Sequence, residues 1–143
     1  MGQPPLFSAA DRHYNSLRVK HLRDLGYQVI LPQERHGFQD DVMIIKGKGK
    51  RIRKAHFEKD MKLLKQADVI IAVLNGTDVD SGTAVEASVA YSLGKKVIGL
   101  REDFRKYSSL EEVNLMVEGV CGWRILHNIK QVSAVLAELK GVR

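Results

Sequence analysis

Short apolar runs alternate with amphipathic segments along this chain. Four apolar runs predict β-strands, at residues 27–31, 67–74, 96–100 and 121–126. Between them, apolar residues recur at spacings near three and four, which predicts helices over about 9–25, 53–66, 83–93 and 129–139. Short strands that alternate with such helices are typical of a parallel sheet covered on both faces. We therefore expect a doubly wound α/β fold with four to five strands.

The start of the chain fits this pattern least well. Only GQPPLF precedes Ser8, and two prolines make a poor central strand. We expect either a short or degenerate first strand or a natural start that lies upstream. Ser8, followed three residues later by Asp11, fits a capping box for the first helix. No internal repeat or interdomain linker is visible, so residues 1–143 are expected to form a single domain.

The composition is that of an ordinary soluble globular protein, with 44% hydrophobic and 28% charged residues. No apolar run approaches the roughly 20 residues that a membrane helix needs. The N-terminus shows no export or acylation signal. The single cysteine, Cys121, excludes an internal disulfide and lies in an apolar pattern, where a small core residue is the simpler interpretation than a nucleophile. These features indicate a cytoplasmic protein without a membrane partner.

The net charge of +6 comes from one segment. Residues 46–54, KGKGKRIRK, hold six of the 23 basic residues and no acidic one, and the remaining 17 basic residues equal the 17 acidic ones in number. A nucleic-acid-binding surface usually spreads its basic residues and often interleaves aromatic ones. This segment has none, so we expect a solvated loop or a flap near an anionic ligand rather than a nucleic-acid site.

Three carboxylates cluster where the second predicted strand leads into a helix, in DVDSGTAVEASVAYSLGKK: Asp78, Asp80 and Glu86. Ligands of parallel sheets bind beyond the carboxyl ends of the strands, and Gly82 allows close approach of a ligand there. A purely structural interpretation is also open, in which Thr83 caps the helix and Glu86 completes a capping box.

Carboxylates around a cleft suit the cleavage of a bond at an anomeric carbon, where one attacks and another acid assists the leaving group. Asp80 and Glu86 are separated by a glycine-containing turn that can bring both side chains toward one cleft. Asp60 on the preceding helix is a further candidate, although a solvated helix-face charge is the plainer interpretation of Asp60. A metal site is not expected, because no histidine is suitably spaced near these acids.

With these motifs, the chain resembles the nucleoside 2-deoxyribosyltransferase family, whose superfamily also contains the 2'-deoxynucleoside 5'-monophosphate N-glycosidases. The resemblance extends over PLFSAADRHYN, LGYQVILPQ, FEKDMKLLKQADVIIAVLNGTDVDSGTAVEASVAYSLGKKVIGL and VNLMVEG, and DSGTxxExxxAxxxGK is its most specific part. It implies a flavodoxin-like sheet and no metal or organic cofactor.

The resemblance also implies roles for individual residues. Glu86 matches the nucleophile that attacks C1' of deoxyribose, and Asp60 matches the acid near the departing base. Asp80 matches a residue that holds sugar hydroxyls. The remaining implied substrate-binding residues are Gly82, Phe7 and Ser8 of the first loop, and Asn114 and Met116 of the NLM motif, which family members present to a neighbouring subunit's site. Core packing for Phe7, a cap for Ser8 and a surface turn for Asn114 remain alternatives.

We therefore expect an oligomeric enzyme that moves 2-deoxyribose between nucleobases through a covalent glycosyl-glutamate, with retention of configuration. A hydrolase of deoxynucleosides or their 5'-monophosphates is the nearest alternative, and a non-catalytic nucleotide-binding module is a further one. The carboxylate of Asp80 would repel a phosphate, which favours free nucleosides, whereas the basic segment 46–54 points weakly toward phosphate.

Overall fold

The computed structural model describes residues 9–34 and 49–141. Contacts within the chain divide it into two compact units, residues 1–60 and 61–143. The first unit contains α1 (Ala9–Asp24), η1 (Pro32–Glu34) and most of α3 (Gly49–Gln66), and the second contains the sheet. The single domain expected for residues 1–143 stays a prediction. The expected first strand, Phe7 and Ser8 lie outside the described residues.

The helix predicted over about residues 9–25 is confirmed as α1, which ends in a Schellman pattern. The N–H of Tyr27 donates to the carbonyl of Leu22 at 3.1 Å, and the N–H of Gly26 donates to that of Arg23 at 2.9 Å. Gly26 has a φ of +84°, a conformation that glycine adopts without strain. The buried side chain of Leu22 anchors this last turn.

The strand predicted at residues 27–31 is wrong, because this segment forms no regular element among the described residues. Its side chains do alternate between half-buried and exposed, which is the pattern behind the prediction. However, the carbonyl of Val29 accepts a hydrogen bond from the Arg23 side chain at 2.9 Å, and Arg23 also pairs with Glu34 at 2.8 Å. Among the residues that the structure describes, a side chain of α1 therefore holds this segment.

The helix predicted from residue 53 begins four residues earlier, at Gly49. Residues 49–54 of the basic segment are therefore helical, which corrects the expectation of a loop there; residues 46–48 lie outside the described residues. Lys54 pairs with Glu58 at 3.8 Å, and both side chains are mostly exposed. Such a surface pair within a helix contributes only about 0.3–0.5 kcal/mol, so Lys54 adds little stability through it.

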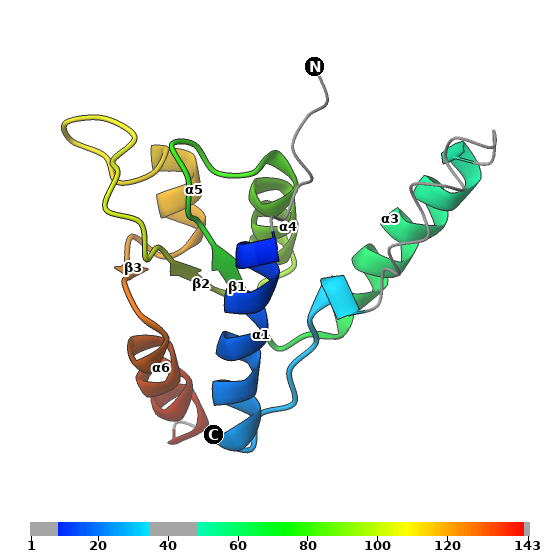
Figure 1. Cartoon of the computed structure of the whole chain (residues 1–143), viewed down its shortest axis with the longest axis horizontal. Coiled ribbons are helices and arrows are strands. Elements are labelled where there is room, and N and C mark those ends of the chain that lie inside the picture. Colours follow the sequence, from blue (N-terminus) through cyan, green and yellow to red (C-terminus); the bar gives the residue numbers. More distant parts are fainter. Residues whose placement is uncertain (1–8, 35–48, 142–143) are drawn as a thin grey trace. The chain divides into compact units, whose positions relative to one another are not determined.

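The second unit has a parallel sheet, which confirms the predicted fold class (Figure 1). Three strands pair side by side in the order β1 (Val69–Val73), β2 (Lys96–Leu100) and β3 (Ile125–Leu126). The register aligns Leu100 with both Val73 and Leu126. All three strands therefore end at the same edge of the sheet.

The fourth predicted strand, residues 121–126, is confirmed only at its last two residues, β3. An unpredicted helix, α5 (Leu115–Val120), precedes it and is capped by Cys121. Gly122 and Trp123 then have φ values of +72° and +59°. Two consecutive left-handed residues are incompatible with extended strand geometry, so the strand begins only after them.

Helices cover both faces of the sheet. α4 (Ser81–Ser92) contacts β1, β2 and α5, whereas α6 (Ile129–Gly141) contacts β2 and β3. Figure 1 shows α4 and α5 on one side of the sheet and α6 on the other. These bounds confirm the helices predicted over 83–93 and 129–139 to within two residues.

Close packing under α4 and α5 depends on Gly99 in the middle of β2. A Cβ atom at Gly99 would lie 2.9 Å from the Cδ1 atoms of Ile125 and Leu74, and 3.0 Å from Sγ of Cys121. Only glycine therefore fits here without displacing its neighbours. The surrounding core cluster consists of Ala72, Leu74, Ala87, Ala90, Val97, Val113 and Cys121.

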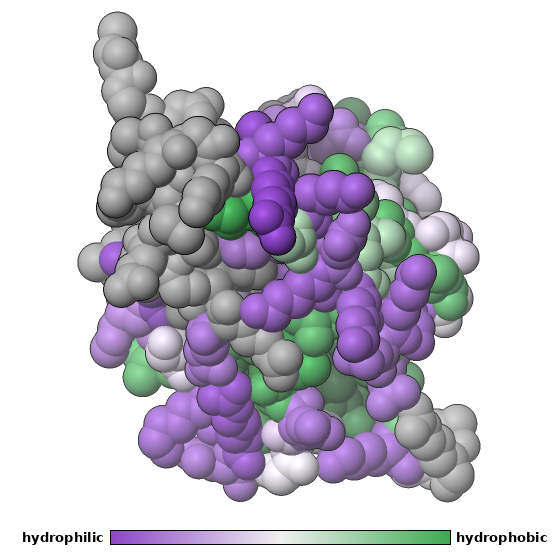
Figure 2. Space-filling model, turned by 90° about the vertical axis from the view of Figure 1, so that its right-hand side faces the viewer, coloured by the Kyte–Doolittle hydropathy of each residue, from purple (hydrophilic) through white to green (hydrophobic). Residues whose placement is uncertain are grey.

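Hydrophilic side chains cover much of the described surface in Figure 2, with hydrophobic patches between them. None of the described helices combines the length and the apolar character needed to cross a membrane.

Candidate active site

The carboxyl ends of the strands carry the loops that lead to the predicted site. The backbone ladder extends one residue past β1 and β2: the N–H of Leu74 donates to Leu100 at 2.8 Å, and the N–H of Arg101 donates to Leu126 at 2.7 Å. The loop after β1 then runs over residues 75–80 into α4, and the loop after β2 leads to α5. Both loops therefore begin side by side.

Asp80, and not Thr83, caps α4. Its Oδ2 accepts a hydrogen bond from the backbone N–H of Thr83 at 2.9 Å and lies 3.3 Å from the Thr83 hydroxyl. The expected capping box of Thr83 and Glu86 is therefore wrong, because the helix begins two residues earlier than the sequence suggests. Gly82 contributes to the cap, since a Cβ atom there would lie 3.0 Å from Asp80 Oδ2.

Glu86 consequently lies in the second turn of α4. Its side chain is half-buried, and its neighbours Ala87 and Ala90 are fully buried against the sheet. With a rise of about 1.5 Å per residue, Glu86 lies about 9 Å along the helix axis from the cap at Asp80. Glu86 therefore lies at the margin of the face of α4 that packs on the sheet.

The third clustered carboxylate, Asp78, has a local role. Its Oδ1 accepts a hydrogen bond from the N–H of the next residue, Val79, at 2.8 Å. The turn before it needs glycine: Gly76 has a φ of +111°, and a Cβ atom there would lie 2.9 Å from the carbonyl oxygen of Asp78.

Asn114 and Met116 lie at the start of α5, which packs against α4. Asn114 is the N-cap, and its Oδ1 accepts a hydrogen bond from the N–H of Met116 at 2.9 Å. The Met116 side chain is 70% exposed. The structure thus groups Asn114, Met116, Asp80, Gly82 and Glu86 in the second unit.

Asp60 is half-buried on α3 and belongs to the first unit. Its participation with Asp80 and Glu86 in one cleft stays a prediction. Phe7 and Ser8, also predicted to contribute to the site, lie outside the described residues.

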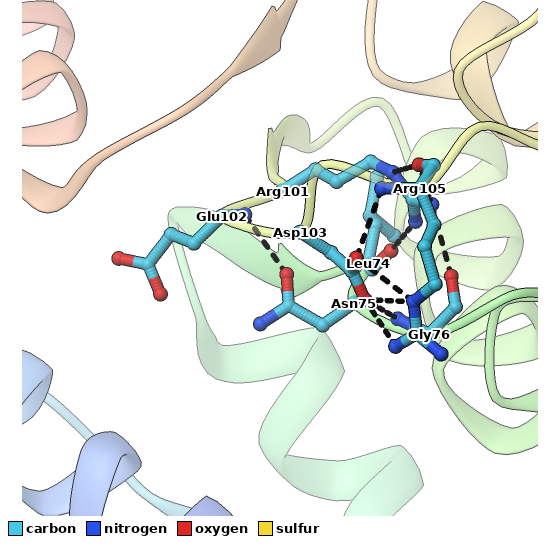
Figure 3. Close-up of polar contacts among 7 residues, drawn as sticks. All are labelled: Leu74, Asn75, Gly76, Arg101, Glu102, Asp103 and Arg105. Atoms are coloured by element: carbon cyan, nitrogen blue, oxygen red, sulfur yellow. Dashed lines mark hydrogen bonds and ion pairs between the residues drawn. The ribbon is translucent and has the colours of Figure 1, made fainter.

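Sequence reasoning missed Arg101, which begins the loop after β2. Arg101 is 2% exposed, and its guanidinium donates to the carbonyl oxygens of Leu74, of Gly76 at 2.9 Å and of Arg105 at 3.2 Å. Figure 3 shows these bonds between the two loops. The available signal was its position, directly after the apolar run VIGL at the edge where parallel sheets bind ligands.

Asp103 strengthens the same network. Its Oδ2 accepts a hydrogen bond from the N–H of Gly76 at 3.0 Å, and its carboxylate pairs with the Arg105 side chain. Hydrogen bonds from the side chain and backbone of Arg105, together with the one from Gly76, hold the pKa of Asp103 well below its usual value. Asp103 therefore stays ionised at neutral pH.

Two cavities lined by described residues lie beside this network and do not include Glu86. The larger, of about 420 Å³, is lined by Lys106, Leu110, Glu111, Glu112, Glu118, Trp123, Arg124 and Ile125. The smaller, of about 160 Å³, lies next to it and includes Arg101 and Asp103. His127 borders the smaller one, and its Nδ1 lies 3.1 Å from the carbonyl oxygen of Arg101.

Cys121 is a core residue, as predicted, with 3% of its surface exposed. Burial, with a smaller contribution from Glu118, raises the pKa of its thiol to about 11. It is therefore a neutral thiol at physiological pH and a poor nucleophile. Among the described residues, no group of three or more His, Cys, Asp or Glu side chains is arranged to hold a metal ion.

In the second unit, the loop after β1 is acidic, contains glycine and leads into the helix that carries Glu86. These features define an α/β protein with acidic residues beyond the carboxyl ends of its parallel strands. The chain belongs to the nucleoside 2-deoxyribosyltransferase family, whose model matches residues 1–141. This confirms the resemblance seen in the sequence and indicates an enzyme of the pentosyltransferase type.

The chain is also similar to a solved structure, the crystal structure of a conserved protein from Enterococcus faecalis V583. The two share 26% sequence identity with a TM-score of 0.65, and the match covers 90% of each chain. No curated protein matches the chain.

Proposed function

We propose that this protein transfers 2-deoxyribose between nucleobases, with Glu86 as the nucleophile. Family membership over residues 1–141 supports the reaction class. The observation that carries the role of Glu86 is the Asp80 cap on α4. Because Asp80 supplies the cap, Glu86 is not part of a capping box. A half-buried carboxylate one turn into this helix is consistent with a nucleophile that faces a sugar.

In the proposed reaction, the carboxylate of Glu86 attacks C1' of the deoxyribose. The N-glycosidic bond breaks, and its electron pair leaves with the base, which takes a proton from Asp60. A second base then attacks C1' of the glycosyl ester, loses a proton to Asp60 and releases Glu86. Two displacements at the same carbon retain the configuration.

Asp80 is proposed to hold a sugar hydroxyl through Oδ1. Its Oδ2 is occupied by the cap to Thr83, which fixes the orientation of the carboxylate. An ionised carboxylate at this position repels the phosphate of a 5'-monophosphate. The proposed substrates are therefore free 2'-deoxynucleosides and nucleobases.

Phe7 is assigned to contact the base, and Ser8 is assigned to the lining of the pocket. Asn114 uses its side-chain oxygen for the cap of α5, and we assign its amide N–H groups to the sugar in the site of a neighbouring subunit, together with Met116. This assignment makes the functional form a homo-oligomer. Its test is the appearance of activity when two differently inactivated variants, Glu86→Ala and Asn114→Ala, are mixed and allowed to reassemble.

The test of the reaction is an exchange assay. A 2'-deoxynucleoside is incubated with a second nucleobase, and the products are separated by chromatography. We expect a new deoxynucleoside with the wild type and a loss of roughly 10³-fold or more in rate for Glu86→Gln. Glu138→Gln is the matched control, because Glu138 is an exposed glutamate on α6. Intact-protein mass spectrometry is expected to show the glycosyl adduct on wild type alone.

The same assay distinguishes the alternatives. Free deoxyribose in place of a new nucleoside would assign hydrolysis to the site, and faster turnover of the 5'-monophosphate would reverse the substrate assignment. Binding of nucleosides without turnover, unchanged in Glu86→Gln, would refute the enzymatic proposal.

A further inference from the structure

The side chain of Arg101 is buried in a way that simple core packing does not explain. Among the described residues, Arg101 is the charged residue that is buried, with 2% of its surface exposed. The hydrogen bonds of its guanidinium go to backbone carbonyl oxygens of Leu74, Gly76 and Arg105. Removing a cation from water costs several kcal/mol in practice, and an apolar side chain of similar volume would fill the space without that cost.

Arg101 holds the loop that precedes α4, the helix that carries the proposed nucleophile Glu86. Two side chains hold the backbone of Gly76, and we call this pair of hydrogen bonds the grip on Gly76. The Arg101 guanidinium donates to the Gly76 carbonyl at 2.9 Å, and the Asp103 carboxylate accepts from the Gly76 N–H at 3.0 Å. Asn75 adds a third tie, because its Oδ1 accepts from the N–H of Glu102 at 2.9 Å. Figure 3 shows the side chains of the β2 loop meeting residues 74–76.

This grip lies four residues before the cap of α4 at Asp80. Of the three residues between them, 77 and 78 are exposed, and Val79 is half-buried and packs against the core. The conformation of Gly76, with a φ of +111°, is one that side-chain-bearing residues rarely adopt. The bonds from Arg101 and Asp103 therefore hold the turn at Gly76, whereas core packing holds Val79, the residue next to Asp80.

We propose that Arg101 and Asp103 are positioning residues, whose grip on Gly76 determines where α4 begins and thereby where Asp80 and Glu86 meet the sugar. The inference rests on the proposed function of Glu86 as the nucleophile. A nucleophile acts efficiently when it lies about 3–3.5 Å from the atom it attacks, and a displacement of about 1 Å lowers the rate by roughly 10²-fold. Loosening the turn therefore slows the attack on C1' more than it weakens substrate binding.

The variants are Asp103→Ala, which removes the acceptor for Gly76, and Asp103→Asn, which keeps a side-chain oxygen for it. Arg101→Lys retains the charge but loses the forked geometry that reaches several carbonyls. Arg124→Lys is the matched control, because Arg124 is exposed and lies just before β3, outside both loops. Thermal unfolding of each variant establishes that it is folded at the assay temperature.

Two measurements are made on each folded variant. Amide hydrogen exchange of residues 76–83 is expected to accelerate at least about tenfold in Asp103→Ala and Arg101→Lys, and to stay near wild type in Asp103→Asn and Arg124→Lys. The single-turnover rate of base release at saturating nucleoside is expected to fall roughly 10–100-fold in the same two variants, with KM changed less than about threefold.

The outcomes separate the two proposals. Unchanged exchange in residues 76–83 overturns the inference, whatever the activity. Faster exchange with an unchanged single-turnover rate also overturns it, because the grip would then be structural only. If the wild type catalyses neither base exchange nor hydrolysis, the proposed function is refuted. The amide hydrogen exchange data then still decide whether Arg101 and Asp103 position α4.

Discussion

Asp80 caps α4 and is the proposed ligand of a sugar hydroxyl, and substitution can remove these two roles one at a time. As the N-cap of α4, its Oδ2 accepts hydrogen bonds from the backbone N–H and the hydroxyl of Thr83. As the proposed sugar ligand, its Oδ1 binds a hydroxyl of deoxyribose. Asparagine and serine cap helices about as well as aspartate, whereas alanine does not. The series Asp80→Asn, Asp80→Ser and Asp80→Ala therefore distinguishes the two roles.

The expected stabilities follow from the cap alone. Asp80→Ala leaves the N–H of Thr83 without its acceptor, which costs about 1 kcal/mol, within a range of about 0.5–2 kcal/mol. Asp80→Asn and Asp80→Ser are expected to stay within about 0.5 kcal/mol of wild type. Urea unfolding followed by circular dichroism measures these differences as shifts of the midpoint at constant slope.

The expected activities follow a different order. A hydrogen bond to a charged group contributes about 1.5–3 kcal/mol, so loss of the carboxylate lowers kcat/KM for a 2'-deoxynucleoside by roughly 10–150-fold in Asp80→Ser and Asp80→Ala alike. Asp80→Asn keeps a neutral acceptor and is expected to fall between them and wild type. Removing the negative charge also improves the relative use of the 5'-monophosphate in Asp80→Ser.

The reasoning is refuted if activity follows stability across the series. If Asp80→Ser is as active as wild type while Asp80→Ala is inactive, the carboxylate acts only as a cap. If Asp80→Ala is as stable as wild type, the cap itself contributes nothing measurable. Glu138→Ala at an exposed position of α6 provides a carboxylate control that does not involve α4.

Two further predictions concern the core of the second unit. Gly99→Ala introduces a Cβ atom 2.9 Å from Ile125 and Leu74, and such overpacking costs about 1–3 kcal/mol; thermal denaturation checks this, and an unchanged Tm contradicts it. Cys121 is expected to react slowly with a thiol reagent in the folded protein at pH 7 to 8 and rapidly in urea. Because burial raises the pKa of Cys121 to about 11 in the folded state, stability is expected to fall as the pH rises above about 8.5, where the unfolded thiol ionises; Cys121→Ala lacks this decline.

Local patterns in the sequence were sufficient for most elements of the fold. The spacing of apolar residues predicted α1, α4 and α6, and glycine at 26 and 94 ended two of these helices with positive φ values, as a backbone without a Cβ atom allows. Continuous apolar runs predicted β1 and β2, because strands buried on both faces need no polar positions. The family was also evident from the motif that contains Asp80 and Glu86.

Other features depended on which groups compete for the same hydrogen bonds in three dimensions. Both Asp80 and Thr83 are good N-caps, and only the folded backbone shows that the cap is Asp80, which moves Glu86 out of the capping box. Residues 27–31 alternate as a strand does, but strand formation requires a partner, and Arg23 takes the carbonyl of Val29 instead. Such a choice is not encoded in a local pattern.

The hydrogen bonds from Arg101 to the turn at Gly76 also depend on tertiary structure and not on a local sequence pattern. In the sequence, Arg101 is one of 23 basic residues, and only its position directly after an apolar run distinguishes it. Its role arises because parallel pairing brings the ends of β1 and β2, which are 27 residues apart in the chain, to one edge of the sheet. The sequence alone determined the fold class, the family and the candidate acid residues. Tertiary structure decided which side chain caps α4 and which one holds the turn at Gly76 before it, because the first depends on where the folded helix begins and the second on contacts between residues distant in the chain.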